Sequence, residues 1–164
     1  RRGVSWMKDA PDKELSKALQ AVRKARLALR MSFIANALSD LNTPIPATVN
    51  LSKMSATRLP AKDLSGTSDP YVVISQNTIA LTSVTIARNL NPVWDDEFLF
   101  DITSPDALLQ VVVWDWDDRR SHDFIGKCFF TATELLAVRK HTLVKNLRDE
   151  DGKYAGTFKF DVEC

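Results

Sequence analysis

The spacing of hydrophobic residues divides the chain into a helical part followed by a strand-like part. In the first part, apolar residues recur three, four and seven positions apart, as on one face of a helix: Leu15, Leu19, Val22, Leu29 and Phe33. This spacing predicts a helix over residues 12–40, although Arg26 interrupts its apolar stripe. The segment "NTPIP" at 42–46 then ends the helix and acts as a linker.

From Ala47 onward, short runs of alternating apolar and polar residues are separated by turn residues, a pattern typical of an all-β sandwich. Phe98, Phe100 and Ile102, for example, alternate with Glu97, Leu99 and Asp101, which predicts one buried face. The predicted strands cover residues 47–58, 70–76, 80–88, 96–102, 107–116, 124–131, 141–147 and 155–163. The sequence therefore predicts an N-terminal helix and linker (1–46) and an eight-stranded antiparallel Greek-key β-sandwich (47–164), with a short helix in "TATELLAV".

Composition and charge narrow the class of protein. The 164 residues are 45% hydrophobic, as in a globular domain, and no apolar run approaches the ~20 residues that span a bilayer. Net charge is +1, but bases concentrate in residues 13–30, whereas acids gather at 95–123 and 149–151. Two cysteines make no disulfide framework, which favours a reduced, cytoplasmic location.

Five aspartates stand out because they occupy two predicted loops. Asp63 and Asp69 lie in the first loop, and Asp115, Asp117 and Asp123 in a later one. If the loops adjoin, these carboxylates repel one another unless they are protonated or bound to cations. Oxygen ligands in flexible loops suit calcium, whereas magnesium demands stricter geometry. Zinc is not favoured, because only His122 is near and no cysteine pair accompanies it.

Three segments, "LPAKDLSGTSDPYV", "NLNPVWDDEFLF" and "VVVWDWDDRRSHDFIG", resemble the hallmark segments of the C2 domain family. The resemblance runs from about Thr48 to Phe160. The segments "SHDFIG" and "GKYAGTFKF" are similar to the second such domain of copines, and protein kinase C is nearly as close. It implies a β-sandwich that binds Ca²⁺ and phospholipid at one end. The implied calcium ligands are the carboxylates of Asp63, Asp69, Asp115, Asp117 and Asp123 and the backbone carbonyls of Lys62 and Trp116.

The order of strands favours the family's permuted (type II) topology, in which the extra strand comes last. A strand-like run at 155–163 follows the others, and none clearly precedes residue 47. The competing interpretation makes "LALRMSFIANAL", residues 27–38, the first strand.

The resemblance also implies how the loops meet a membrane. Leu64 is expected to insert shallowly, while Arg119 and Arg120, where many members carry an apolar residue or a hydroxyl, are expected to contact anionic headgroups. The lysine-rich groove of some members is not evident. The predicted function is calcium-dependent binding to anionic, phosphatidylserine-like membranes, with recruitment from the cytoplasm when calcium rises.

Two other classes of function stay open. The domain either binds a protein without calcium or is the regulatory piece of a larger signalling enzyme. Catalysis by this chain is not expected, because His122 and His141 are far apart and neither a Gly-x-Ser-x-Gly motif nor a phosphate-binding loop is present. No nucleic-acid partner is expected. The basic helix is a linker that packs on a domain, or else it lies on a membrane or binds a calmodulin-like protein partner.

Overall fold

The computed structural model describes residues 17–31, 44–118 and 121–164. The chain forms two compact units, residues 1–39 and 40–164. In the first unit, residues 17–31 form an α-helix, as predicted, and the remaining positions of the predicted helix over 12–40 lie outside the described residues. The division of the chain at residue 46 stays a prediction.

The regular secondary structure of the second unit is mostly antiparallel strands. These are β1 (Ala47–Thr57), β2 (Pro70–Gln76), β3 (Ile79–Thr82), β4 (Val93–Trp94), β5 (Phe98–Ile102), β6 (Leu108–Asp115), β7 (Asp123–Thr131), β8 (Lys140–Arg148) and β9 (Tyr154–Glu163). Each of the eight predicted strands is present, and the two-residue strand β4 is additional. The short helix α2 (Ala132–Leu135) forms within the predicted segment.

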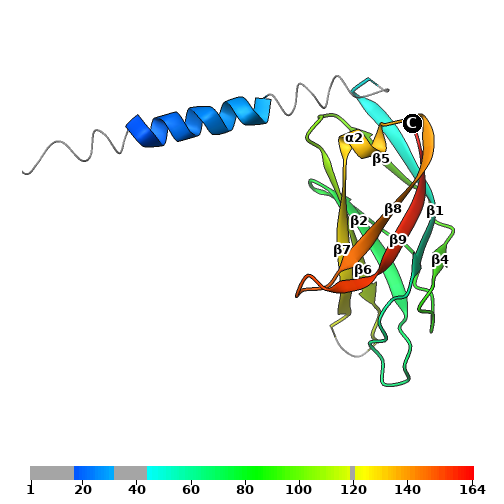
Figure 1. Ribbon diagram of the computed structural model, residues 1–164. Helices are drawn as coiled ribbons and strands as arrows, with labels where there is room; N and C mark the ends of the chain where they lie inside the picture. The colour runs from blue at the N-terminus through cyan, green and yellow to red at the C-terminus, as the bar shows by residue number, and fades with distance from the viewer. Residues whose placement is uncertain (1–16, 32–43, 119–120) are drawn as a thin grey trace, which may run out of the picture. The chain divides into compact units, whose positions relative to one another are not determined.

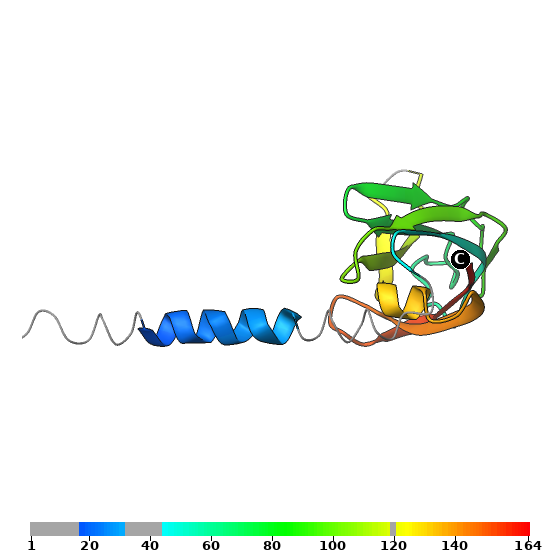
Figure 2. The ribbon, with the colours of Figure 1, turned by 90° about the horizontal axis from the view of Figure 1, so that it is seen from above.

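The strands form two layers that face each other across the core (Figures 1 and 2). One layer has the order β3-β2-β6-β7 and the other the order β8-β9-β1, with β4 and β5 both paired to β1. The two layers are joined by strand pairing at a single residue pair between β7 and β8, Lys127 with Arg148. Gly126 permits this approach, because a Cβ atom there would lie 3.0 Å from that of Ala155.

The core follows from the alternation seen in the sequence. Phe98, Phe100 and Ile102 of β5 are buried, whereas Leu99 and Asp101 between them are exposed. The largest fully buried side chains come from both layers: Trp94, Phe100, Phe130, Phe158 and Phe160. Phe130 packs edge-on against Phe160, with 4.8 Å between ring centroids, so the two layers interlock through aromatic contacts.

The strand order confirms the prediction that the extra strand follows the others. The last strand, β9, pairs antiparallel with β1, from Asn50 opposite Glu163 to Thr57 opposite Thr157. The competing interpretation, a first strand at 27–38, is wrong for residues 27–31, which are helical. Residues 32–38 lie outside the described part of the chain.

The third strand is shorter than the predicted 80–88, because β3 ends at Thr82. The hydroxyl of Ser83 accepts the hydrogen bond from the Val72 amide, at 3.0 Å, and so takes the place of a backbone carbonyl in the ladder. The Ile86 amide still donates to the Pro70 carbonyl of β2, at 3.0 Å, and the chain then turns at Ala87 and Arg88. Residues 83–92 therefore form a connecting segment rather than the end of a strand.

The sandwich has two ends of different character. The first loop (residues 59–69) and the described residues of the loop that follows β6 (116–118 and 121–122) lie at one end, which we call the loop pole (Figure 1). Helix α2 lies at the opposite end, together with the start of β1 and the end of β9, and we call this end the α2 pole (Figure 1).

Candidate metal centre

Strand register brings three of the predicted aspartates together at the loop pole. Pro70, the residue after Asp69, is paired with Asp115, and Asp115 is paired in turn with Asp123. Asp69 immediately precedes β2, Asp115 ends β6 and Asp123 begins β7. These three neighbouring strands therefore each have one aspartate at the same end of the layer. The sequence separation between Asp69 and Asp123 hides this proximity, which the pairing alone creates.

The first loop is closed by its own backbone hydrogen bonds. The amides of Lys62 and Asp63 both donate to the Thr67 carbonyl, at 3.1 and 3.0 Å, and the Gly66 amide donates to the Asp63 carbonyl at 3.0 Å. Gly66 has a positive φ of 79°, which suits this turn. Leu64 lies at the tip with a relative exposure of 104%, so this side chain has no packing contact to lose on leaving water.

Asp69 links three segments of chain at the loop pole. Its amide donates to Oδ1 of Asp115, with 2.5 Å between nitrogen and oxygen. Its carbonyl accepts from the Trp116 amide at 3.0 Å. Its own Oδ1 accepts from the Arg88 amide at 2.6 Å. Two of the predicted ligand carboxylates, those of Asp69 and Asp115, are thus each held by a backbone N–H.

Asp115 is the buried member of the group, with 1% relative exposure. It extends the inward-facing row of Val111 and Val113 on β6, so the strand geometry carries its carboxylate toward the core. Burial raises the pKa of this carboxyl most. The hydrogen bond from Asp69 lowers the pKa, whereas the nearby charges of Asp63 and Asp117 raise it, and the net shift is upward.

Asp123 faces a different space from Asp115 although the two residues are paired. Its side chain lines a cavity of about 370 Å³ together with Lys62, Phe124 and the acidic turn between β8 and β9, which supplies Asp149, Glu150 and Asp151. The charges of Asp63 and Asp117 thus act on Asp115, whereas Asp123 shares the lining of a cavity with Lys62.

Charge at the loop pole is not balanced by ion pairs within the described part of the chain. Among the ion pairs formed within residues 17–31, 44–118 and 121–164, none involves Asp63, Asp69, Asp115, Asp117 or Asp123. Within the same residues, no three Asp, Glu, His or Cys side chains are gathered closely enough to hold a metal ion. The acids share one end of the molecule without forming a closed coordination cage.

The donor set at this pole nevertheless suits a hard cation. Carboxylate and carbonyl oxygens in loops are the ligands that calcium accepts, in flexible geometry. Asp115 is held in place by a backbone amide, and its ionised form is disfavoured by burial and by like charges. A divalent cation would relieve both effects, so the residues fit calcium by their chemistry.

Aromatic side chains border the loop after β6. Trp116 is 42% exposed and lies 6.3 Å, between ring centroids, from His122. The Nδ1 atom of His122 lies 2.7 Å from the hydroxyl of Tyr71, so this histidine has a hydrogen-bond partner on β2. Arg119 and Arg120, predicted to contact lipid, lie outside the described residues.

Three features of the site were not identified from the sequence. Ser68 is fully buried, and its hydroxyl accepts from the Lys62 amide and donates to the Pro60 carbonyl. The turn at 149–151 borders Asp123, and its acidity was visible in the sequence but its position was not. Arg88 acts through its backbone, which no residue-type pattern signals.

Known proteins that contain C2 domains are similar to this chain in sequence. A family model described as the C2 domain matches residues 47–149. The chain is 41% identical over 81 residues to human "Multiple C2 and transmembrane domain-containing protein 1", a match that covers 49% of this chain and 8% of that protein. It is 34% identical over 116 residues to the Drosophila melanogaster "Protein kinase C, eye isozyme", covering 66% of the chain and 16% of the kinase.

A solved structure shares the fold. A C2 domain of plant Extended Synaptotagmin 1 superposes with a TM-score of 0.66 at 25% identity, covering 74% of this chain and 95% of that one. The chain spans less than a fifth of the length of the curated relatives named above. In the part of the chain that the structure describes, no helix is both long and apolar enough to cross a bilayer.

Proposed function

Because the chain belongs to the C2 domain family, we propose that residues 47–164 bind anionic phospholipid membranes in a calcium-dependent manner. The residues that would hold calcium are Asp63, Asp69, Asp115, Asp117 and Asp123, together with the backbone carbonyls of Lys62 and Trp116. Calcium, when bound, would supply positive charge and coordination positions that phosphate or carboxylate oxygens of a lipid can complete. The chain would act as a binding module without catalysis of its own.

The uncompensated carboxylate of Asp115 is the observation that supports this proposal most. A buried acid with a raised pKa and no cationic partner among the described residues is costly to the fold. Such an arrangement indicates a group kept for a ligand, because an asparagine would make the same hydrogen bond without the charge. Binding would draw the carboxylates of the two loops together, since they are not gathered around a common point beforehand.

The residues that face a membrane would change the electrostatics of the loop pole. Without a cation, the five carboxylates repel an anionic leaflet. Leu64 is free to insert its apolar side chain because it is fully exposed at the loop tip. Arg119 and Arg120 would add roughly 1 kcal/mol each near an anionic surface, an attraction that salt weakens.

Sedimentation with phosphatidylserine vesicles tests the proposal. The chain is expected to sediment in calcium and to stay in solution in a chelator. Asp115→Asn combined with Asp117→Asn should abolish sedimentation in calcium. Asp95→Asn with Asp96→Asn is the matched control, because it removes two charges from an acidic pair outside the predicted ligands. Equal sedimentation of the unmodified chain in calcium and in chelator would refute the calcium dependence.

Two alternatives lead to different results. A domain that binds a protein without calcium would show neither vesicle binding nor a change in melting temperature with calcium. A regulatory piece of a larger signalling enzyme would still show both. The location that we propose is the cytoplasm, with recruitment to membrane when calcium rises.

The N-terminal helix is proposed as a separate contact for a protein partner. Residues 17–31 contain five bases and no acid, and the like charges of Arg23 and Arg26, one turn apart, disfavour an isolated helix. An acidic protein surface would relieve this repulsion. A peptide of residues 12–40 should therefore gain helicity with an acidic calmodulin-like protein. A gain with anionic vesicles alone would instead indicate a membrane contact.

A further inference from the structure

We infer that Arg88 is a positioning residue for the proposed calcium site, and that it acts through its backbone amide rather than its guanidinium. The inference rests on the proposed function of the loop pole. It concerns how the Asp69 carboxylate is fixed before any ion arrives, and it assigns this role to the connecting segment of residues 83–92.

The contact that carries the inference is short and specific. The Arg88 amide donates to Oδ1 of Asp69 at 2.6 Å, and the Asp69 amide donates to Oδ1 of Asp115 at 2.5 Å. The two bonds form a relay from the connecting segment through the first loop to the end of β6. Each bond joins a backbone N–H to an ionisable carboxylate oxygen, and such charge-assisted bonds are the stronger class of hydrogen bond.

The conformation of Arg88 is the second observation. Its φ is +52°, in the left-handed region that residues other than glycine rarely occupy. Its side chain is exposed, so no burial of the guanidinium explains the conformation. The residue whose N–H reaches Asp69 therefore has a left-handed backbone, and unfavourable conformations of this kind concentrate at functional sites.

The neighbouring bonds show that the connecting segment is hydrogen-bonded to the start of β2 and to the first loop. The amides of Ile86 and Asn89 donate to the carbonyls of Pro70 and Ser68, at 3.0 and 2.9 Å. Leu59 donates to the Leu90 carbonyl at 3.0 Å, on the other side of the loop. Arg88 differs from Ile86 and Asn89, because its amide donates to a side-chain carboxylate instead of a backbone carbonyl.

A pair of neutral substitutions separates the backbone from the charge. Arg88→Asn and Arg88→Val both remove the guanidinium, but asparagine tolerates the left-handed conformation, whereas the β-branched valine does not. We expect calcium affinity, measured by titration calorimetry, to be on the order of tenfold weaker in Arg88→Val than in Arg88→Asn. Arg88→Gly, which adopts this conformation without strain, should bind calcium as well as Arg88→Asn does.

Folding of each variant is checked by circular dichroism and by thermal unfolding in chelator. If Arg88→Val does not fold, Arg88→Ala takes its place, because alanine also disfavours the left-handed region without β-branching. Equal affinities in the asparagine variant and in the valine or alanine variant would overturn the inference. An equal loss in all of them relative to the unmodified chain would overturn it too, since the effect would then belong to the guanidinium.

A measurement without calcium keeps the inference distinct from the proposed function. The amide proton resonance of Arg88 should move strongly on Asp69→Asn, because its acceptor loses a charge, and little on the control Asp95→Asn. If the unmodified chain binds no calcium, the proposed function fails, and this resonance still decides whether Arg88 holds Asp69. An Arg88 resonance that ignores Asp69→Asn would overturn the inference in either case.

Discussion

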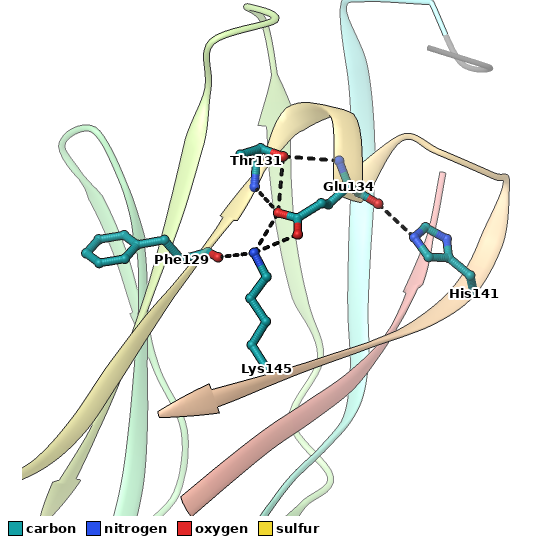
Figure 3. Close-up of polar contacts among 5 residues, drawn as sticks. All are labelled: Phe129, Thr131, Glu134, His141 and Lys145. Atoms are coloured by element: carbon teal, nitrogen blue, oxygen red, sulfur yellow. Dashed lines mark hydrogen bonds and ion pairs between the residues drawn. The ribbon is translucent and has the colours of Figure 1, made fainter. Parts of the chain in front are cut away.

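The two poles of the sandwich each contain a half-buried or buried carboxylate, and the fold treats them in opposite ways. At the α2 pole, Glu134 accepts hydrogen bonds from the Thr131 amide and hydroxyl and forms an ion pair of 2.6 Å with Lys145 (Figure 3). At the loop pole, Asp115 accepts a hydrogen bond from the Asp69 amide but has no cationic partner among the described residues.

The surroundings of Glu134 form a closed network. The Nζ atom of Lys145 also donates to the Phe129 carbonyl at 2.7 Å and lies 4.8 Å from the centroid of the Phe130 ring. His141 contacts the Glu134 carbonyl through Nε2 at 2.8 Å (Figure 3). Burial opposes ionisation of Glu134, but the bonds from Lys145 and Thr131 outweigh it and lower the pKa of this carboxyl.

This contrast separates an acid whose charge is neutralised within the fold from one that the proposed function assigns to a ligand. The charge of Glu134 is balanced by Lys145, so the carboxylate at the α2 pole needs no ligand to neutralise it. The charge of Asp115 is not balanced by the described residues, so the loop pole is less stable by itself and gains from any cation that binds there. The following predictions test this difference, in order of decreasing size.

The largest expected effect is stabilisation by calcium. At a free calcium concentration about one hundred times Kd, binding should add about 2.7 kcal/mol to the free energy of unfolding and raise Tm by several degrees. Asp115→Asn should lose this gain, whereas Glu134→Gln should retain it from a lower starting Tm. Thermal unfolding with calcium and with chelator measures both. A calcium response that survives Asp115→Asn would place the ion elsewhere.

Removing the cation at the α2 pole should come next. Lys145→Met keeps an apolar side chain against Phe130 but leaves Glu134 without its partner, at a cost of about 1–2 kcal/mol after allowance for partial exposure. Denaturant unfolding measures the loss. Lys140→Met is the matched control, because the Lys140–Glu163 pair is well exposed, and it should leave stability unchanged. Equal effects of the two substitutions would contradict the proposed difference in burial.

A smaller loss is expected from the cap of α2. Thr131 accepts a hydrogen bond from the Glu134 amide and receives the Glu134 side chain in return, so both halves of a capping box are present. Thr131→Ala should cost about 1 kcal/mol in unfolding free energy, and Thr131→Ser much less. Vesicle sedimentation in calcium should be unchanged in both variants, since this pole takes no part in the proposed binding.

The smallest effect is a difference in pH dependence, measured by Tm in chelator. The lowered pKa of Glu134 gives stability that is present above the ordinary carboxyl range and is lost as pH falls through the folded pKa. The raised pKa of Asp115 has the opposite sign, so its penalty grows as pH rises from the ordinary range through the folded pKa. Glu134→Gln should therefore weaken the loss at low pH, and Asp115→Asn should remove the penalty at higher pH. Identical pH profiles would contradict the contrast.

The sequence by itself determined most of the strands, and it predicted the class of site. Alternation of apolar and polar residues is a local property, so it located eight strands, and "TATELLAV" indicated α2. Oxygen-bearing side chains in two loops likewise indicated the chemistry of the loop pole. The end of β3 was missed, because it depends on one hydroxyl, that of Ser83, replacing a carbonyl.

Only the tertiary structure decided which acids meet and which are neutralised. Asp115 ends a strand and Glu134 lies in a short helix, but the residues next to each of them along the chain do not show whether a cation neutralises its charge. Pairing between β2 and β6 brings Asp69 next to Asp115. Strand β8 places Lys145 where it forms an ion pair with Glu134 of α2. Charge balance is a sum over neighbours in space, and strand pairing joins residues many positions apart. For this reason the sequence predicted the carboxylates, whereas the fold determined their partners.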